Sequence, residues 1–238
     1  MSEVLLKIEN LNKSFGITHA NVNINFELKA GEVRGLAGEN GSGKSTLLSQ
    51  IAGLYGSDSG KMYIRGEEYS PKNPVDANNH KVAMVVQELG MIGSLPASIN
   101  IYLGKTKKFI KMNDLQDQAN AVSDRWGLPR VNLKRMAGSM NIENRKMVEL
   151  IRALAADPDI LILDEVLSVG DARFRKKSLA KVQSMFDQGV TVLFVSHNIQ
   201  QVKAICDTAI LLEKGHIIAS GDVDTVAAVY EEKSGKKK

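Results

Sequence analysis

The chain of 238 residues is 43% hydrophobic and 24% charged, which is ordinary for a globular domain with a substantial core. Its 31 basic residues exceed the 27 acidic ones by four, and four lysines without any acid lie in the last six positions: Lys233, Lys236, Lys237 and Lys238. The rest of the chain is therefore neutral, so a basic face for nucleic acid is not expected.

The sequence also bears on location. No apolar run approaches the roughly 20 residues that a bilayer-spanning helix needs. The first residues lack the positive and then apolar pattern of a secretory signal. The single cysteine, Cys206, excludes an internal disulfide and is predicted to be a small buried side chain. These features favour a reducing cytoplasm.

The N-terminal third is predicted to consist of strands separated by turns. The predicted strands cover residues 4–8, 22–28, 33–37, 61–65 and 82–86. The first two alternate hydrophobic and polar side chains, as half-buried antiparallel strands do, whereas the last is continuously apolar. One helix-like stretch, residues 46–52, directly follows a glycine-rich loop.

From residue 97 to 155 the pattern is helical, with apolar side chains three and four positions apart at Leu115, Ala119, Val122 and Trp126. Short apolar strands, a hairpin and a last helix follow, over residues 160–163, 191–195, 209–219 and 223–232. The two short runs are typical of central parallel strands. This order predicts a single α/β domain, residues 1–238. Its core and antiparallel β subdomain (about 1–87 and 156–238) would enclose a helical subdomain (about 88–155).

Residues 38–45 read Gly-Glu-Asn-Gly-Ser-Gly-Lys-Ser, a complete G-x-x-x-x-G-K-S phosphate-binding loop between a strand and a helix. Backbone N–H groups of such a loop cradle the β- and γ-phosphates, and the positive end of the following helix adds to the attraction. Lys44 would supply a mobile positive charge, and the Ser45 hydroxyl would ligate Mg²⁺. The residues expected to hold the nucleotide here are Gly38, Asn40, Gly41, Ser42, Gly43, Lys44, Ser45 and Thr46.

Two carboxylates follow the apolar strand over residues 160–163. Asp164 and Glu165 would lie at the carboxyl edge of the sheet, where ligands bind to parallel sheets. We expect Asp164 to hold Mg²⁺ through its water shell. We expect Glu165 to polarise the water that attacks the γ-phosphorus.

In this order, the motifs resemble those of ATP-binding-cassette (ABC) proteins over essentially the whole chain. The resemblance implies an ABC-type P-loop NTPase fold, with ATP and Mg²⁺ as cofactors. It places Phe15 where the family stacks an aromatic ring on adenine, and Gln87 where a glutamine contacts Mg²⁺ and the attacking water. His197 would hydrogen-bond the γ-phosphate and hold Glu165 in line, and Asp171 matches the loop that reaches across a dimer.

ABC ATPases work as face-to-face pairs, and each nucleotide is closed in by the partner's signature, Leu-Ser-Gly-Gly-Gln, at the start of a helix. In the family pattern the last signature residue lies eight positions before an Arg-Ala-Leu arginine, which itself lies twelve before the metal-strand aspartate. Arg152 lies twelve before Asp164, so the signature slot is residues 140–144, Met-Asn-Ile-Glu-Asn. Asn141 can still donate in place of serine, but Glu143 replaces the second glycine.

Glu143 would bring a side chain and a negative charge toward a phosphate. Two unit charges about 4 Å apart repel by about 1 kcal/mol in water and ~4 kcal/mol at an effective dielectric constant of about 20. Because the chain keeps Asp164, Glu165 and His197, we hypothesise an asymmetric pair with a second, different cassette. If Glu143 turns outward, both sites would work. The alternative of a pair made of two identical chains therefore stays open.

The two halves of the chain resemble different transporters. Residues 1–155 resemble the ATPases of simple-sugar importers of the ribose, xylose and galactose type, and residues 160–230 resemble ATPases that export polysaccharide or teichoic acid. We favour import, because residues after Gln87 contact the permease in this family and match importers. The implied partners are transmembrane permeases, a second ABC ATPase subunit and, indirectly, a solute-binding protein. The chain would then lie at the cytoplasmic face of the membrane.

Three alternatives stay open: an exporter ATPase, a soluble ABC ATPase of DNA repair or translation, and a cassette that binds ATP without hydrolysing it. Soluble members usually carry long coiled-coil insertions or tandem cassettes, which are absent from this sequence. Glu165 and His197 argue against a cassette that only binds. The transported solute cannot be derived from these motifs.

Overall fold

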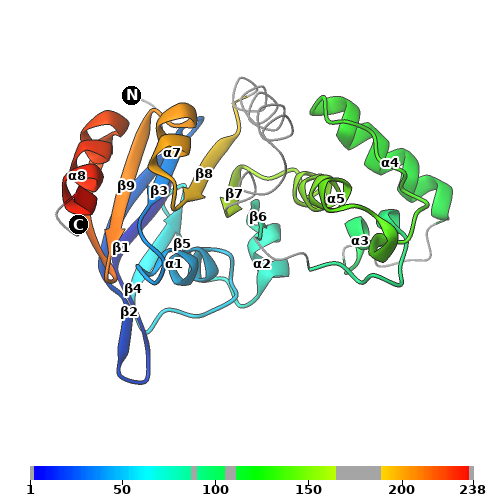
Figure 1. Ribbon diagram of the computed structural model, residues 1–238. Coiled ribbons are helices and arrows are strands. Elements are labelled where there is room, and N and C mark those ends of the chain that lie inside the picture. The colour runs from blue at the N-terminus through cyan, green and yellow to red at the C-terminus, as the bar shows by residue number, and fades with distance from the viewer. Residues whose placement is uncertain (1–2, 87–89, 105–110, 165–188, 236–238) are drawn as a thin grey trace.

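The computed structural model describes residues 3–86, 90–104, 111–164 and 189–235. Its larger sheet has six strands, shown in Figure 1. From edge to edge they are β10 (His216–Asp222), β9 (Thr208–Glu213), β3 (Val33–Ala37), β8 (Thr191–Ser196), β7 (Ile160–Asp164) and β6 (Val82–Val85). Every pairing in this sheet is parallel except that of β10 with β9. The mostly parallel core sheet of the predicted α/β fold is confirmed.

The smaller sheet is antiparallel, with the order β2 (Thr18–Lys29), β1 (Val4–Phe15), β4 (Ser59–Ile64) and β5 (Glu67–Tyr69). β1 and β2 are longer than the alternation of side chains predicted. The reason is that their register shifts between Ile8 and Leu11, and again between Leu11 and Lys13. Each irregularity changes which side chains face the core, so the period of two is lost while the strands stay paired.

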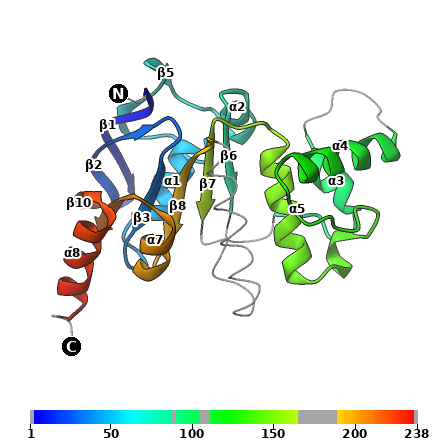
Figure 2. The ribbon, with the colours of Figure 1, turned by 90° about the horizontal axis from the view of Figure 1, so that it is seen from above.

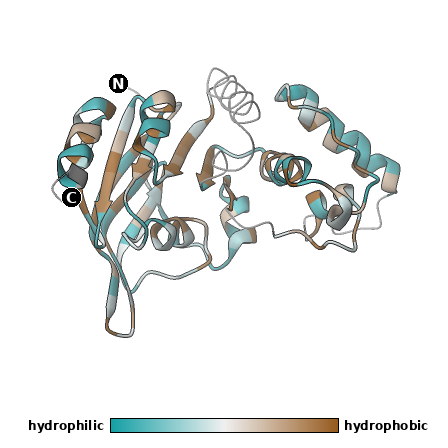
Figure 3. Cartoon of the chain, viewed as in Figure 1, coloured by the Kyte–Doolittle hydropathy of each residue, from teal (hydrophilic) through white to brown (hydrophobic). Residues whose placement is uncertain are grey.

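Both faces of the larger sheet are covered, which explains why its strands are continuously apolar. On β7, Ile160 and Ile162 pack in one cluster with the smaller sheet and with α1 (Lys44–Ile51). Leu161 and Leu163 face the other way, in a cluster with α5 (Ile142–Leu154), α7 (Ile199–Ile205) and α8 (Val223–Gly235). Figure 3 shows hydrophobic residues concentrated on the central strands, whereas the helices carry both kinds of residue.

The stretch predicted to be helical forms α3 (Ala97–Tyr102), α4 (Met112–Arg125), a short 3-10 turn and α5. As the spacing predicted, Leu115, Ala119 and Trp126 are buried, and Val122 is half-buried. In two views these helices lie beyond the edge strand β6, at the opposite end of the sheet from α8 (Figures 1 and 2). The exact division into subdomains stays a prediction.

The remaining short helix, α2 (Pro74–Asn79), directly precedes β6. Asn73 caps it, because its side-chain oxygen accepts a hydrogen bond from the Asp76 amide at 2.9 Å. Cys206, at the end of α7, is buried as expected, and burial raises the pKa of its thiol. Within the described ranges, no helix combines the length and the apolar character that a membrane crossing requires.

Candidate nucleotide site

The phosphate-binding loop connects β3 to α1, as its sequence context predicted. Gly43 forms the N-cap of α1 with a φ of 102°, a conformation that favours glycine. A Cβ atom at this position would lie 2.2 Å from the Ala20 carbonyl oxygen. No side chain caps α1, and its first turn carries no acid. The first N–H groups of α1 therefore keep their capacity to bind an anion.

Lys44 lies folded over the loop. Its Nζ atom donates hydrogen bonds to the carbonyl oxygens of Gly38 at 2.8 Å and Glu39 at 2.9 Å. The side chain is buried. Its positive charge is thus held within the turn whose amides would cradle phosphates, which is the location that the motif predicted.

A cavity of about 790 Å³ opens beside the loop. It brings together the following residues that were predicted to act on the nucleotide: Phe15, Asn40, Gly41, Gly43, Lys44, Ser45, Thr46, Asp164 and His197. Its volume falls in the range of cofactor sites, about 300–1,000 Å³. Gly38 and Ser42 do not line this cavity; the carbonyl of Gly38 binds Lys44, and Ser42 is buried behind the loop.

Phe15 stands at the rim of the cavity with 46% of its surface exposed. Its ring contacts Tyr55 edge to face, with centroids 5.4 Å apart, and the Lys13 amine lies 5.6 Å from its centroid. These contacts hold the ring while leaving much of it accessible for stacking.

Sequence reasoning missed several residues of this site. Thr18, His19 and Ala20 line the same cavity from β2, and Lys214 lines it from the turn between β9 and β10. For Thr18, His19 and Ala20, the signal available in the sequence was that they closely follow Phe15, across the turn of one hairpin. No local pattern marks Lys214, which lies 169 positions after the last residue of the loop, Ser45.

Asp164 ends β7, and His197 directly follows the last residue of the neighbouring strand β8. β7 and β8 are parallel, with Asp164 beside Val195, so both functional side chains emerge at the same edge of the sheet. Asp164 is 7% exposed. The Tyr230 hydroxyl of α8 donates a hydrogen bond to the His197 carbonyl at 3.2 Å, and Asn198 caps α7. The backbone on both sides of His197 is thereby held in place.

Of the three residues expected to hold Mg²⁺, the structure describes Ser45 and Asp164, whereas Gln87 lies outside the described residues. The predicted catalytic Glu165 and the predicted dimer-loop residue Asp171 also lie outside them. Within the described residues, no three or more His, Cys, Asp or Glu side chains gather as a metal cage. Mg²⁺ needs no such cage when it keeps waters and shares phosphate oxygens with one or two carboxylates. A hydroxyl and a carboxylate beside the phosphate loop fit that arrangement, and the individual roles stay predictions.

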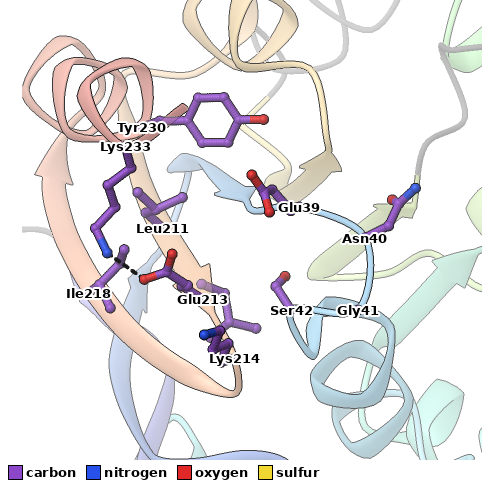
Figure 4. A pocket seen from close by; sticks show the side chains of 11 residues that line it. Glu39, Asn40, Gly41, Ser42, Leu211, Glu213, Lys214, Ile218, Tyr230 and Lys233 are labelled. Atoms are coloured by element: carbon purple, nitrogen blue, oxygen red, sulfur yellow. Dashed lines mark hydrogen bonds and ion pairs between the residues drawn. The ribbon is translucent and has the colours of Figure 1, made fainter. Parts of the chain in front are cut away.

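A smaller cavity of about 180 Å³ lies on the other side of the loop, between residues 39–42, the β9–β10 hairpin and α8 (Figure 4). Lys233 of α8 forms an ion pair with Glu213 of β9 at its wall. Lys214 lines both cavities. The hairpin therefore connects the C-terminal helix with the back of the phosphate loop.

The residues of the signature slot lie at the start of α5, as the spacing required. Asn141 is the N-cap, and its side-chain oxygen accepts a hydrogen bond from the Asn144 amide at 2.9 Å. Glu143 lies in the first turn and is half-buried. A side-chain cap and an acid both satisfy a helix N-terminus from within the chain.

A groove of about 590 Å³ is lined by α2, β6, α5 and residues 103–104, which directly follow α3. Leu54, Val75 and Leu103 line it as exposed apolar side chains. Glu149 is buried in its wall, and this burial raises the pKa of its carboxyl although the Arg152 guanidinium, 3.8 Å away, opposes the shift. The groove thus combines an apolar rim with a buried charge.

Known proteins resemble this chain in sequence. A family model described as ABC transporter matches residues 22–168. A putative carbohydrate transport ATP-binding protein of Mycoplasma pneumoniae is 34% identical, and a ribose import ATP-binding protein of Rhodococcus jostii is 30% identical. Each alignment covers 92% of this chain, but only 41% and 44% of the respective relative. The chain therefore spans less than half the length of these relatives.

Among solved structures, a dimeric ATP-binding cassette bound to ADP and phosphate after hydrolysis has a similar fold. The TM-score is 0.80, and the alignment covers 92% of this chain and 99% of that one. At 23% identity, this likeness supports the fold alone.

Proposed function

Because this chain belongs to the ABC transporter family of ATP-binding cassettes, we propose that it binds ATP with Mg²⁺ and hydrolyses it to power the import of a simple sugar or related solute. The observation that carries this proposal is a single cavity in which the phosphate loop meets Phe15, Asp164 and His197. The family hydrolyses ATP in transporter function. The sugar is inferred from relatives whose names specify ribose or carbohydrate.

In this proposal, different described residues bind the adenine, the phosphates and the Mg²⁺ of the nucleotide. The ring of Phe15 stacks on adenine, and the amides at the start of α1 bind the phosphates. Lys44 exchanges the carbonyl oxygens of the loop for phosphate oxygens. Ser45 and Asp164 hold Mg²⁺, which when bound neutralises charge on the phosphate oxygens.

Hydrolysis needs three further groups in this proposal. Glu165 accepts a proton from the attacking water, and Gln87 helps to orient that water. His197 donates a hydrogen bond to the γ-phosphate and keeps the water in line. The bond from Tyr230 to the His197 carbonyl supports this role, because it limits the backbone movement of the residue that carries the imidazole.

The working unit is an asymmetric pair of cassettes. The cap that Asn141 provides to α5, and the acid at Glu143, support the idea that this chain offers a poor phosphate-binding surface to its partner. The partner's own signature would then close over the intact phosphate loop of this chain. One site of the pair would turn over, and the other would be degenerate.

The membrane partner would dock in the groove lined by α2, β6, α5 and residues 103–104. The exposed apolar side chains of Leu54, Val75 and Leu103 suit the apolar face of an amphipathic segment of a permease. Val86 and Gly90 line this groove, and in the sequence they lie on either side of Gln87. The chain would act at the cytoplasmic face of the membrane, and a solute-binding protein would contact the permease.

ATP binding and hydrolysis can be separated with two variants of the full chain. We expect Lys44→Ala to weaken MgATP binding at least tenfold, because it removes the charge that faces the phosphates. We expect Glu165→Gln to bind MgATP normally and to lose at least about 100-fold in turnover, as removal of a general base does. Lys61→Ala, at an exposed position of β4, is the control. Normal binding by Lys44→Ala, measured calorimetrically, would refute the nucleotide site.

Transport is tested by copurification with the permease from detergent-solubilised membranes. We expect Leu54→Asp together with Val75→Asp to abolish the complex while MgATP binding stays unchanged. Vesicles containing the assembled system should then take up sugar only with wild-type cassette and ATP. Export of a glycan from the same vesicles would instead identify an exporter, and absence of any membrane partner would favour a soluble ABC ATPase.

A further inference from the structure

Two buried amide side chains lie beneath the phosphate loop. Asn21 of β2 is 1% exposed, and Gln50 of α1 is fully buried. The Nδ2 group of Asn21 donates to the Gly43 carbonyl at 3.1 Å, and the Nε2 group of Gln50 donates to the Asn21 side-chain oxygen at 2.8 Å. The two amides therefore form a chain of hydrogen bonds that ends on the loop itself.

Such a pair is costly to bury. An amide without compensating hydrogen bonds loses free energy in an apolar core. The Oε1 atom of Gln50 has no hydrogen-bond partner among the described residues. Leu47, Leu48 and Ile51, the neighbours of Gln50 on α1, join the apolar cluster instead. Because apolar side chains would satisfy the contact between α1 and β2 more cheaply, the amides call for a different explanation.

The geometry of the peptide bond explains why these amides are useful beneath the loop. In a trans peptide, the carbonyl group and the following N–H group point in opposite directions. Holding the Gly43 carbonyl toward the core therefore directs the Lys44 N–H group away from it, toward the phosphate side. The Gly43 oxygen also accepts the first helical bond, from the Leu47 amide at 3.0 Å, and a carbonyl oxygen has room for both donors.

The preceding peptide group is held in the same manner. The Gly215 amide, in the β9–β10 turn, donates to the Ser42 carbonyl at 2.9 Å, which directs the Gly43 N–H group outward. The Gly215 carbonyl accepts in turn from the Val22 amide at 2.8 Å. Figure 4 shows this turn beside the loop, with Lys214 and Ser42 on facing sides. The backbone N–H groups of two consecutive loop residues, Gly43 and Lys44, are thus oriented by groups behind the loop. The β9–β10 turn orients the first, and the side chains of Asn21 and Gln50 orient the second.

We infer that Asn21 and Gln50 are positioning residues, which orient the phosphate loop and thereby set its affinity for the terminal phosphates of a nucleotide. This inference rests on the proposed ATP-binding function. Asn21 acts on the loop directly, and Gln50 acts through Asn21 by fixing its side-chain orientation. Neither residue lines the nucleotide cavity.

The test replaces both amides by apolar side chains, in the variant Asn21→Leu with Gln50→Leu. Removing both partners of a buried hydrogen bond is nearly neutral for stability, whereas the loop loses its support. We therefore expect the thermal midpoint without nucleotide to stay near that of wild type. We expect the Kd for MgATP and MgADP to rise about 3- to 10-fold, which corresponds to the loss of one hydrogen bond. Asn25→Leu, an exposed position on the same strand, is the matched control.

The outcomes are distinguishable. If wild type does not bind MgATP, the proposed function fails. If wild type and the double variant bind equally well, the amides only fill space and the inference is overturned. Should the double variant not fold, Gln50→Leu alone decides the question: a rise in Kd of about twofold or more with an unchanged circular dichroism spectrum supports the inference, and an unchanged Kd rejects it.

Discussion

Two helices of this chain begin where the family places phosphate-binding groups, and their N-termini are built in opposite ways. α1 starts at a left-handed glycine, without a capping side chain and without an acid in its first turn. α5 is capped by Asn141, whose side chain satisfies a backbone amide, and carries Glu143 as its second residue. One N-terminus is left open for an external anion, and the other is closed by its own residues.

A helix N-terminus is available to an external phosphate only when its own chain leaves its amides unsatisfied. The support behind the two helices differs as well. α1 buries a neutral amide, Gln50, that is bonded toward the phosphate loop. α5 buries an ionisable carboxyl, Glu149, at the groove where we place the permease. In the function we propose, α1 would thus serve the nucleotide and α5 the membrane partner.

The largest effect is expected from filling the glycine cap of α1. Gly43→Ala places a Cβ atom 2.2 Å from the Ala20 oxygen in a left-handed conformation. Crowding and backbone conformation together cost about 3 kcal/mol or more, so MgATP affinity should fall at least about 100-fold. Gly66→Ala is the control, because φ is 81° there and nothing lies within 4 Å. Its stability should fall by about 1 kcal/mol without a change in affinity.

An intermediate effect is expected from opening the N-terminus of α5. Glu143→Gly should raise ATP turnover of the assembled pair about fivefold or more, because it removes a repulsion of at least about 1 kcal/mol. Glu143→Gln separates charge from bulk: it should recover much of the gain if charge is the cause, and little if the side chain blocks approach. Steady-state turnover of the complex with its permease measures both. Unchanged turnover in both variants would mean that Glu143 turns outward and that the two N-termini are equivalent in function.

The smallest effect concerns stability. Burial raises the pKa of Glu149 above its ordinary 4.5, so the folded chain binds this proton more tightly than the unfolded chain. The contribution of this proton to the free energy of unfolding is fully present below pH 4.5 and is lost as the pH rises through the pKa of Glu149 in the folded chain. Glu149→Gln should therefore raise the thermal midpoint at pH 7, with a gain that vanishes below pH 4.5. Part of the gain is offset by loss of the contact with Arg152.

The exposed Glu67→Gln on β5 is the control for this measurement and should show no such pH dependence. A gain that Glu149→Gln retains at pH 4 would contradict the assignment of the effect to a buried charge. It would then have to come from packing alone.

Much of the fold and of the site followed from local pattern. The phosphate loop, the strand that ends at Asp164 and the strand before His197 were each predicted from a short run of residues, because apolar periodicity and motif spacing are local properties. The family spacing also located the signature slot, and the structure places a helix N-terminus at Asn141. Such features need no knowledge of distant neighbours.

Other features escaped prediction. β1 and β2 continue past the points where alternation stops, because backbone pairing persists through their irregularities. Tyr55 holds the ring of Phe15, and Lys214 reaches the nucleotide cavity, although neither lies in a motif. Contacts of this kind join residues whose separation in the chain follows no period, so no local signal identifies them.

By itself, the sequence determined that this protein has a phosphate loop and an aspartate at the end of an apolar strand, and it predicted an altered signature, since spacing and residue type suffice for these. Only the tertiary structure decided that Asn21 and Gln50 lie beneath that loop and that Gly215 holds it from behind. The physical reason is that a hydrogen bond depends on position and direction in space, and folding brings Asn21, Gln50 and the distant Gly215 to one loop although no local pattern connects them.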